Sequence, residues 1–541
     1  MCSLRLFSLK TLIFSVFLAM FLTACGFPNK YMPPKTLDLT SKVPNAPLDL
    51  STLETKDEAK KTDSIKQDFS LPVSKSISKE LESKDAGLVI SDGSSALLHR
   101  AALIRLAQKS IDLQTYIFDE DTSSGLLSTE LIKAANRGVK IRILVDDNGL
   151  KSNLNTLLKL NENPNIQVKI FNPFRFRSPL LRASIELPFD MKRINRRMHN
   201  KLFIVDDIAF IVGGRNIGDN YFDNSSYDFT DTDVLFMGKV ALSAEDSFNK
   251  FWNFYKSVPI NLVIKKTPKH KKLTNPYPLS KDDQAIYEED LEEFYNNYLN
   301  NKLHFYFGKG IFVADDPSKV DTPLADTRMP ILDLINLNLE LAKKSVYISS
   351  GYLIPGKANL KLWKRLIDRG ISFNILTNSL ASIDVVPVYS FWERYRDKLV
   401  RDGANVYEYN YLESMYLNKK NKAQIRYKLK PFGKQAIYSG LHSKNIVIDD
   451  ELSIVGSFNL DSRSWLYNTE AMMFFRSKGL ADELQENIID QMQSSMQIKC
   501  DKKSCYWLDL KTHKIYHSLP NASIWLRFWK DILKMAPEKL F

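Results

Sequence analysis

Cysteine is scarce in this sequence: it has four in 541 residues, and two of these, Cys2 and Cys25, lie within the first 25 positions. The rest of the chain has only Cys500 and Cys505, which is too few for a disulfide-stapled scaffold. We expect these two to form a local disulfide in an oxidising compartment. His513 and His517 follow closely and leave a structural zinc site as the alternative, although the Cys-to-His spacing is short for a zinc finger.

Acidic residues are outnumbered by basic ones, 63 to 75, which gives a formal net charge of +12. This excess of positive charge suggests an anionic partner, namely a membrane surface, a nucleic acid or a phosphate substrate, with a merely solvated basic surface as the alternative. The composition, 44% hydrophobic and 26% charged, excludes a disordered protein. A single core stops growing near about 250–300 residues, so we expect two or more domains.

The apolar run at the N-terminus, "TLIFSVFLAMFLTAC", is short for a membrane span, which needs about 20 residues. Because Arg5 and Lys10 precede it, residues 1–25 are predicted to be a targeting segment. Its end, Leu22-Thr23-Ala24-Cys25, resembles a bacterial lipobox, in which the cysteine becomes the lipidated N-terminus. An uncleaved signal anchor or an ordinary secretion signal is the alternative. The glycine after the cysteine favours the periplasmic face of the outer membrane over the inner membrane.

Residues 26–85 are rich in Lys, Ser, Asp and Pro and have little aromatic content. Such a stretch buries too little apolar surface to offset its chain entropy, so we expect a flexible tether. The remaining sequence is duplicated: "AQKSIDLQTYIF" recurs as "AKKSVYISSGYLI", "RGVKIRILVDD" as "RGISFNILTNS", and "IQVKIFN" as "ANVYEYN". The ordered recurrence at nearly constant offsets predicts one α/β unit used twice, at residues 86–300 and 301–541.

A polar frame also occurs twice, in "RRMHNKLFIVDDIAFIVGGRN" (196–216) and in "LHSKNIVIDDELSIVGSFN" (441–459). Each is predicted to form a strand, an Asp-Asp turn and a second strand. The histidine and lysine of each frame are two residues apart, so they share one face and together predict a phosphate site. The aspartates lie at the turns, where we expect a structural role without proton transfer. The six motif residues are His199, Lys201, Asp206, His442, Lys444 and Asp449.

Each frame ends on a glycine-containing step, which lets the backbone approach a ligand, and on an asparagine that can donate hydrogen bonds. With these residues the chain resembles the phospholipase D superfamily, whose mark is His-x-Lys-x4-Asp-x6-Gly-Ser-x-Asn in two copies. Gly214 replaces the usual serine in the first copy. The resemblance runs from about residue 86 to the end. It implies an α/β fold of two similar lobes, each a mixed β-sheet flanked by helices, packed face to face around a shared active site.

The resemblance also implies the chemistry. One imidazole attacks phosphorus and forms a phosphohistidine, while the other protonates the leaving alcohol and then deprotonates the incoming one. We take His199 as the nucleophile because the first copy has that role in several relatives. The lysines and a set of phosphate-binding side chains stabilise the charged oxygens, and we expect no metal or cofactor. The phosphate-binding residues are Asn216, Ser457 and Asn459.

In this superfamily a downstream carboxylate orients each histidine through its second ring nitrogen. The stretch "DFTDTDVLFMG" offers Asp231, and "NTEAMMFF" offers Glu470. By resemblance we assign Asp231 to His199 and Glu470 to His442. A solvated carboxylate with no such role is the alternative for each.

Further stretches resemble the bacterial cardiolipin synthases, particularly their C-type branch: "DLQTYIFDED", "NIGDNYF", "FTDTDVLFMG", "ADDPSK" and "RFWKDILKMAPEKLF". That branch transfers a phosphatidyl group onto phosphatidylglycerol. The resemblance therefore implies phospholipid substrates, with phosphatidylglycerol or phosphatidylethanolamine as donor, and an enzyme lying on a membrane to which a lipidated Cys25 would hold it. The rival is a phospholipase D or nuclease that hydrolyses. Nucleic acid is disfavoured because the nuclease members are typically short chains with one copy.

Two basic stretches contain apolar residues. "RFRSPLLR" (175–182), together with Arg193, Arg196 and Arg197, predicts a basic approach to the first frame for lipid phosphates or a nucleic-acid backbone. "IWLRFWKDILKMAP" near the C-terminus has apolar residues at helical spacing with cations between them. This pattern predicts either an interfacial membrane helix or a terminal helix packed on the core.

Overall fold

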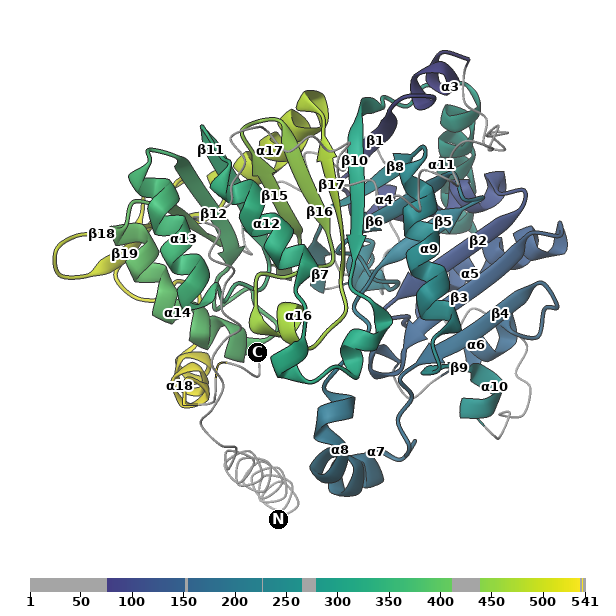
Figure 1. Cartoon of the computed structure of the whole chain (residues 1–541), viewed down its shortest axis with the longest axis horizontal. Helices are drawn as coiled ribbons and strands as arrows, with labels where there is room; N and C mark the ends of the chain where they lie inside the picture. Colours follow the sequence, from purple (N-terminus) through teal and green to yellow (C-terminus); the bar gives the residue numbers. More distant parts are fainter. Residues whose placement is uncertain are drawn as a thin grey trace.

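The structure is a computed structural model, which describes residues 75–150, 154–225, 227–264, 279–410, 438–535 and 538. These residues form two lobes that lie side by side, each a twisted sheet flanked by helices (Figure 1). The targeting segment and most of the predicted tether lie outside the described residues.

The first lobe contains a mixed sheet with strand order β1-β8-β6-β5-β2-β3-β4-β9. The run β2-β3-β4 is parallel and the other pairs are antiparallel. The strands are β1 (Asp85–Ile90), β2 (Ser110–Thr115), β3 (Lys140–Asp146), β4 (Ile166–Phe171), β5 (Leu202–Val205), β6 (Ala209–Gly213), β8 (Asp233–Met237) and β9 (Ser257–Pro259). The main helices are α4 (Gly93–Leu106), α5 (Thr122–Asn136), α6 (Asn155–Leu160), α9 (Val240–Asn253), α10 (Ile260–Val263) and α11 (Lys281–Leu299).

The second lobe repeats this order as β10-β17-β16-β15-β11-β12-β13-β18 and adds β19 and β20 at the edge. Its strands are β10 (Tyr306–Ala314), β11 (Ser345–Ser350), β12 (Ser372–Asn378), β13 (Asn405–Tyr409), β15 (Lys444–Ile448), β16 (Leu452–Gly456), β17 (Ala471–Arg476), β18 (Met496–Cys500), β19 (Cys505–Asp509) and β20 (Ile515–Tyr516). Its main helices are α12 (Pro330–Glu340), α13 (Gly356–Asp368), α14 (Val386–Arg401), α16 (Ser462–Leu466), α17 (Lys478–Gln493) and α18 (Ile524–Leu533).

The predicted duplication is confirmed strand by strand. The three pairs of recurring segments form β2 and β11, β3 and β12, and β4 and β13, and each set is parallel. In these strands buried apolar side chains alternate with polar ones, of which Asp112, Gln114 and Ser349 are also buried.

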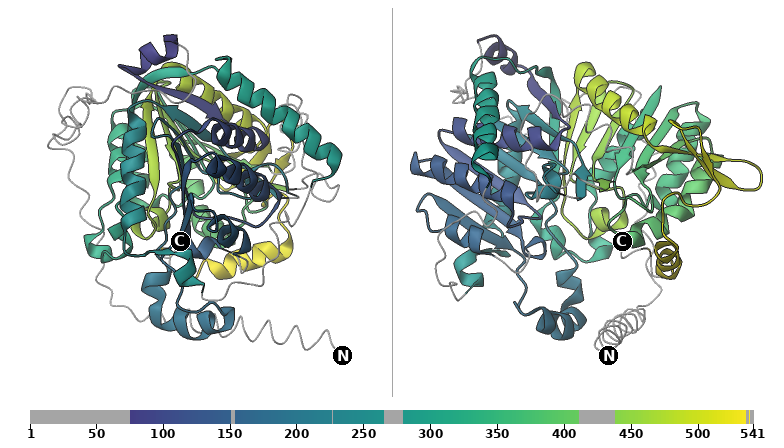
Figure 2. Two further views of the ribbon diagram at one scale, coloured as in Figure 1. Left: turned by 90° about the vertical axis from the view of Figure 1, so that its right-hand side faces the viewer. Right: turned by 180° about the vertical axis from the view of Figure 1, so that it is seen from behind.

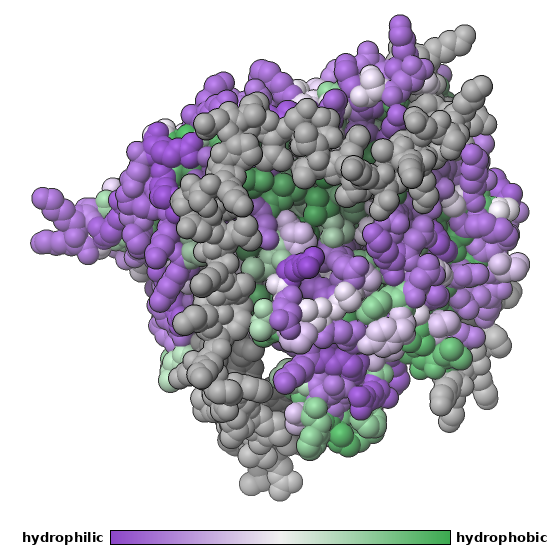
Figure 3. Space-filling view, in the orientation of Figure 1, coloured by the Kyte–Doolittle hydropathy of each residue, from purple (hydrophilic) through white to green (hydrophobic). Residues whose placement is uncertain are grey.

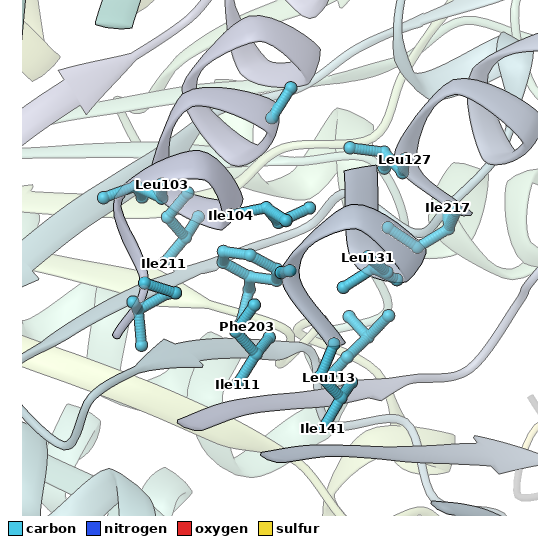
Figure 4. Close-up of a cluster of buried hydrophobic side chains, with 14 of the residues drawn as sticks. Leu103, Ile104, Ile111, Leu113, Leu127, Leu131, Ile141, Phe203, Ile211 and Ile217 are labelled. Atoms are coloured by element: carbon cyan, nitrogen blue, oxygen red, sulfur yellow. The ribbon is translucent and has the colours of Figure 1, made fainter. Parts of the chain in front are cut away.

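The two sheets pack face to face, as the sequence predicts. One core lies between the first sheet and helices α4 and α5 (Figure 4), and another lies beneath α12, α13 and α14 of the second lobe. A third core, which α9 and α17 also enter, joins the inner faces of both sheets. There Phe236 and Phe475 lie 5.1 Å apart between ring centroids. Because burial of a phenylalanine contributes about 1.5–3 kcal/mol, this shared core fixes the lobes against each other.

The folded body begins earlier than the sequence predicts. Helix α3 (Lys75–Leu81) occupies the end of the predicted tether, and β1 begins at Asp85. Leu81 is fully buried in the first core and Ile77 packs against it, so this short helix has an apolar side. The tether prediction is therefore wrong for residues 75–85, whereas residues 26–74 lie outside the described part.

Candidate active site

Each polar frame forms the predicted hairpin, and both hairpins turn on a pair of aspartates. The β5–β6 turn has Asp206 and Asp207 at φ 53° and 61°, and the β15–β16 turn has Asp449 and Asp450 both at 57°. Aspartate tolerates this left-handed conformation better than most residues. The two turns are thus the same structure in both lobes.

The motif aspartates hold the hairpins to the neighbouring strands. The carboxylate of Asp206 accepts hydrogen bonds from the backbone N–H groups of residues 108–110 at 2.7–2.9 Å. Asp449 accepts from the N–H groups of residues 343–345 at 2.6–3.1 Å. These N–H groups lie at or just before the start of β2 and β11, so each aspartate fixes the strand that follows its motif histidine against the neighbouring strand. The contacts agree with the predicted structural role.

The backbone before each histidine pairs with the opposite lobe. Strand β14 (Tyr438–Leu441) runs parallel to β7 (Tyr227–Thr230) of the first lobe, and the N–H of His442 donates to the carbonyl of Thr230 at 2.8 Å. In the same way the N–H of His199 donates to the carbonyl of Thr469 at 2.9 Å. Both histidines therefore lie on the boundary between the lobes.

The histidine side chains cross the same boundary. Nδ1 of His199 lies 2.8 Å from Oε2 of Glu470, and Nδ1 of His442 lies 2.6 Å from Oδ2 of Asp231. The assignment of Asp231 to His199 and of Glu470 to His442 is therefore wrong, because each carboxylate orients the histidine of the other lobe. The physical reason is placement: the carboxylates immediately precede β8 and β17, which lie next to the β1–β10 junction of the two sheets.

Burial governs the protonation of this cluster. It lowers the pKa of His442 to about 4, and it lowers the pKa of His199 well below the usual value, with Lys201 and Lys444 adding repulsion. Burial alone would raise the pKa of Asp231, but the adjacent His442 outweighs it and the pKa falls to about 2. Neutral imidazoles that use Nδ1–H on a carboxylate leave Nε2 unprotonated and available to a substrate.

Glu470 differs from Asp231 in its surroundings. Burial raises the pKa of Glu470 to about 7, against the opposing charge of Lys201. The hydroxyl of Ser457 donates to Glu470 at 2.5 Å and accepts from the N–H of Ala471 at 3.0 Å. Ser457 thus supports the carboxylate that orients His199. Phosphate binding by Ser457 stays a prediction.

The same place in the first motif has no room for a serine. A Cβ added to Gly214 would lie 2.3 and 2.4 Å from the two carboxylate oxygens of Asp231. Asp231 instead accepts a hydrogen bond from the N–H of Thr232 at 2.8 Å. The departure from the family pattern therefore follows from the shorter carboxylate, which lies directly against the glycine backbone.

The motif lysines complete the cluster. Nζ of Lys201 donates to the carbonyl of His199 at 2.7 Å, and Lys444 donates to the carbonyl of His442. Burial lowers the pKa of both lysines, and that of Lys201 to about 7. An anionic phosphodiester would stabilise both ammonium groups, because opposite charge favours the ionised form.

Both predicted asparagines are buried beside the motifs. Oδ1 of Asn216 accepts from the N–H of Ile117 at 3.1 Å, and its side chain also bonds the hydroxyl of Tyr221. Oδ1 of Asn459 is buried without a hydrogen-bond partner within the described residues. Their binding of phosphate stays a prediction.

Two tyrosines beside the histidines were missed by the sequence reasoning. The ring of Tyr116 lies edge-on to His199 with centroids 5.2 Å apart, and Tyr352 lies likewise beside His442 at 6.1 Å. They also lie beneath the motif lysines, with ammonium-to-centroid distances of 5.7 and 5.8 Å. The signal was present, because both tyrosines occupy the same place in the repeated segments "QTYIF" and "SGYLI".

The predicted basic approach is only partly exposed. Arg197 is fully buried with Nη1 3.4 Å from Asp146, and the buried Arg196 donates to the carbonyl of Lys319 at 3.3 Å. These two arginines run into the lobe boundary just before His199, so their guanidinium groups bond the protein. The prediction that they face a substrate is wrong.

The remaining predictions concern other parts of the chain. Cys500 and Cys505 form the expected disulfide, which rules out the zinc alternative. Within the described ranges, no group of three or more His, Cys, Asp or Glu is placed to hold a metal ion. No helix in that part of the chain is long and apolar enough to cross a membrane. Cys25 lies outside the described residues.

Comparison with known proteins identifies the family. The family model "Cardiolipin synthase, PLD-like domain" matches residues 101–252 and 335–492. An uncharacterized protein of Helicobacter pylori is 43% identical over 470 residues, covering 85% of this chain and 90% of the relative. Cardiolipin synthase C of Escherichia coli is 32% identical over 464 residues, covering 82% and 93%.

Among solved structures, the phosphatidylserine synthase of Haemophilus influenzae matches with a TM-score of 0.53 at 13% identity, covering 86% of this chain and 99% of that one. This likeness supports the two-lobed fold. Together with the duplicated motif, these matches show that the chain belongs to the phospholipase D-like cardiolipin synthase family.

Proposed function

We propose that this chain is a phosphatidyltransferase that makes cardiolipin by moving a phosphatidyl group onto a hydroxyl of phosphatidylglycerol. The observation that carries the proposal is the exchange of carboxylates between the lobes, His199 with Glu470 and His442 with Asp231. Neither lobe contains a complete acid–base pair, so both imidazoles serve one site. The likeness to the synthase of Escherichia coli supports the substrate class.

In the first half-reaction, Nε2 of His199 attacks the phosphorus of a donor phosphatidylglycerol. The bond from phosphorus to the glycerol headgroup breaks, and the leaving oxygen takes a proton from His442. Burial lowers the pKa of His442 to about 4, and the charge of the bound phosphodiester raises it so that the imidazole can enter protonated. Lys201 and Lys444 stabilise the phosphoryl oxygens during the attack.

In the second half-reaction, a hydroxyl of another phosphatidylglycerol gives its proton to His442 and attacks phosphorus. The phosphorus–nitrogen bond to His199 breaks, and cardiolipin and glycerol are the products. Phosphatidylethanolamine as donor would release ethanolamine instead. Attack by water would give phosphatidic acid, which is the competing hydrolysis.

The test is a product analysis. The purified full-length chain is incubated with phosphatidylglycerol vesicles, with and without phosphatidylethanolamine, and the lipids are identified by mass spectrometry. Cardiolipin that disappears in His199→Ala and His442→Ala but persists in the surface control His517→Ala supports the proposal. Formation of phosphatidic acid without cardiolipin would show that the enzyme hydrolyses its substrate and does not transfer the phosphatidyl group. Formation of either lipid by the double histidine variant would refute the mechanism.

The nucleophile is tested by trapping. In His442→Ala the phosphatidyl adduct on His199 cannot be transferred efficiently, so a peptide containing residue 199 should carry it. The same search in His199→Ala should find no adduct. An adduct on His442 instead would reverse the roles.

We further propose that Cys25 is lipidated and holds the enzyme in the cell envelope, at the periplasmic face of the outer membrane. Acyl chains contribute about 0.8 kcal/mol per buried CH₂, so more than one of them anchors a protein durably. Cys25→Ser should lose incorporation of labelled palmitate. Unchanged labelling would contradict this anchor.

A further inference from the structure

A helical projection with exposed apolar side chains lies directly before the first motif. It consists of α7 (Pro179–Leu181), the π-helical turn η4 (Arg182–Glu186) and α8 (Leu187–Ile194). Leu180 is 75% exposed and Phe189 is 86% exposed, with further exposed apolar residues between and beside them. Figure 3 shows apolar side chains gathered at this end of the molecule with hydrophilic ones around them. Exposed large apolar side chains that gather in this way mark an interaction site.

The projection carries a surplus of positive charge. Residues 175–193, which include the loop before the projection, contain five arginines and lysines against two carboxylates. Arg177 pairs with Asp147, and Arg193 pairs with Glu186 and Asp190. Arg175 is 70% exposed, although it lies 3.4 Å from Asp190, and Arg182 covers the ring of Phe174 at 3.9 Å. Lys192 is also exposed. Apolar side chains bordered by cations suit a surface that is apolar inside and anionic outside.

Helix α18 presents a second apolar surface, from the other lobe. Trp525 is 64% exposed and Phe528 is 51% exposed, and their rings stack with centroids 5.6 Å apart. Two lysines at the end of this helix instead face α14, where Lys530 and Lys534 hold Glu393 at 2.8–3.0 Å. The charged side thus attaches the helix to the protein and the aromatic side is left outside.

Both apolar surfaces lie at one end of the molecule. In Figure 1 α7, α8 and α18 occupy the lower end, and both views of Figure 2 keep them there. Helix α8 ends five residues before His199, and Asn195 accepts a hydrogen bond from Arg463 of the second lobe at 2.8 Å. The projection is therefore joined to the second lobe close to His199.

We propose that α7–η4–α8 and α18 form a docking surface for an anionic phospholipid bilayer, so that lipid headgroups reach the histidines without leaving the membrane. This inference rests on the proposed function. Tryptophan at a membrane interface lies with its ring at the headgroup level, and basic residues attract anionic lipid. The burial of apolar area at about 25 cal/mol per Å² drives the insertion of Leu180, Phe189 and Trp525.

A binding measurement tests the surface without reference to catalysis. Amide hydrogen exchange of the full-length chain is followed by mass spectrometry with and without vesicles of phosphatidylglycerol and phosphatidylethanolamine. We expect slower exchange in peptides covering 179–194 and 524–535 when vesicles are added, and less protection at high salt. Unchanged exchange in both segments while the protein floats with the vesicles would overturn the proposal. Protection that instead depends on protein concentration without lipid would assign the surface to a second copy of the chain.

A variant then links docking to turnover. Phe189→Asp/Trp525→Asp should lower cardiolipin formation on vesicles by roughly tenfold or more, since each charge opposes insertion of an apolar group. Activity on the same lipids dispersed in detergent micelles should be retained, as should both activities in the control Ile515→Asp, whose site on β20 is 50% exposed. Equal losses on vesicles and micelles would overturn the docking role. If the wild type protects both segments on vesicles but makes no cardiolipin in either form, the proposed function fails and the docking surface stands.

Discussion

Nδ1 of His199 lies 2.8 Å from a carboxylate oxygen of Glu470, which belongs to the opposite lobe. The mirror relationship joins His442 to Asp231. Each half therefore supplies the carboxylate that contacts the motif histidine of the other, and a single lobe would leave its histidine without this partner. This exchange explains why the chain needs both copies of its motif.

The exchange predicts which histidine responds to each carboxylate variant. Glu470→Gln should shift the ring-nitrogen NMR signals of His199 and leave those of His442 in place, and Asp231→Asn should do the reverse. The reason is that a neutral amide no longer favours the Nδ1–H tautomer of the imidazole it faces. Selective labelling is practical because the chain has only seven histidines. If each variant moved the histidine of its own lobe, the pairing would be refuted.

The glycine in the first motif predicts an asymmetric response to a reciprocal pair of substitutions. Gly214→Ser places a Cβ 2.3 Å from Asp231, so the carboxylate must move. We expect the free energy of unfolding to fall by about 1–3 kcal/mol and kcat to fall with it. Ser457→Gly removes a side chain whose hydroxyl donates to Glu470 and accepts from Ala471, but it introduces no clash and should preserve the fold. Thermal unfolding and kcat of both variants test this, and an active, fully stable Gly214→Ser protein would contradict it.

The lysine cluster predicts an alkaline limit to activity. Burial lowers the pKa of Lys201 to about 7, so the free enzyme loses this ammonium charge as the pH rises through that value. The value of kcat/KM should therefore fall above about pH 7, whereas the limit on kcat should lie higher because bound phosphodiester raises the lysine pKa. Lys201→Arg keeps its charge at this pH, so its kcat/KM should not fall above about pH 7. The surface control Lys250→Arg should still show the fall. If kcat/KM of Lys201→Arg fell above pH 7 as in the wild type, Lys201 would be excluded as the cause of the fall.

The turn aspartates predict losses of stability without a chemical defect. Asp206→Ala leaves three backbone N–H groups without their acceptor, and we expect the free energy of unfolding to fall by about 2–4 kcal/mol. The folded fraction should keep kcat within roughly tenfold of wild type. His199→Ala should behave in the opposite way, with normal unfolding and no turnover. A stable but inactive Asp206→Ala protein would give this aspartate a chemical role.

The sequence predicts the duplicated fold well because its evidence is local and repeated. The strand pairs from "AQKSIDLQTYIF" to "ANVYEYN" and the Asp-Asp turns all have counterparts at the same place in each half. The sequence does not predict that Gln114 and Ser349 on these strands are buried. Both have polar atoms without a hydrogen-bond partner in the described residues.

Contacts between the halves were harder to predict. Asp231 and Glu470 were recognised as orienting groups, but spacing along the chain does not tell which histidine each one reaches. Arg197 illustrates the same limit, because a cation beside a catalytic motif can face either a substrate or Asp146. The packing between the lobes decides the pairing of the carboxylates, and the packing within the first lobe decides the partner of Arg197.

The most direct test of the shared site is a crystal structure of the full-length chain with orthovanadate, which mimics a phosphoryl group in transfer. We predict one vanadate bonded to Nε2 of His199, with Nε2 of His442 hydrogen-bonded to the axial oxygen on the opposite side. Two separate vanadate ions, one at each histidine, or a single ion that contacts only one imidazole, would contradict it.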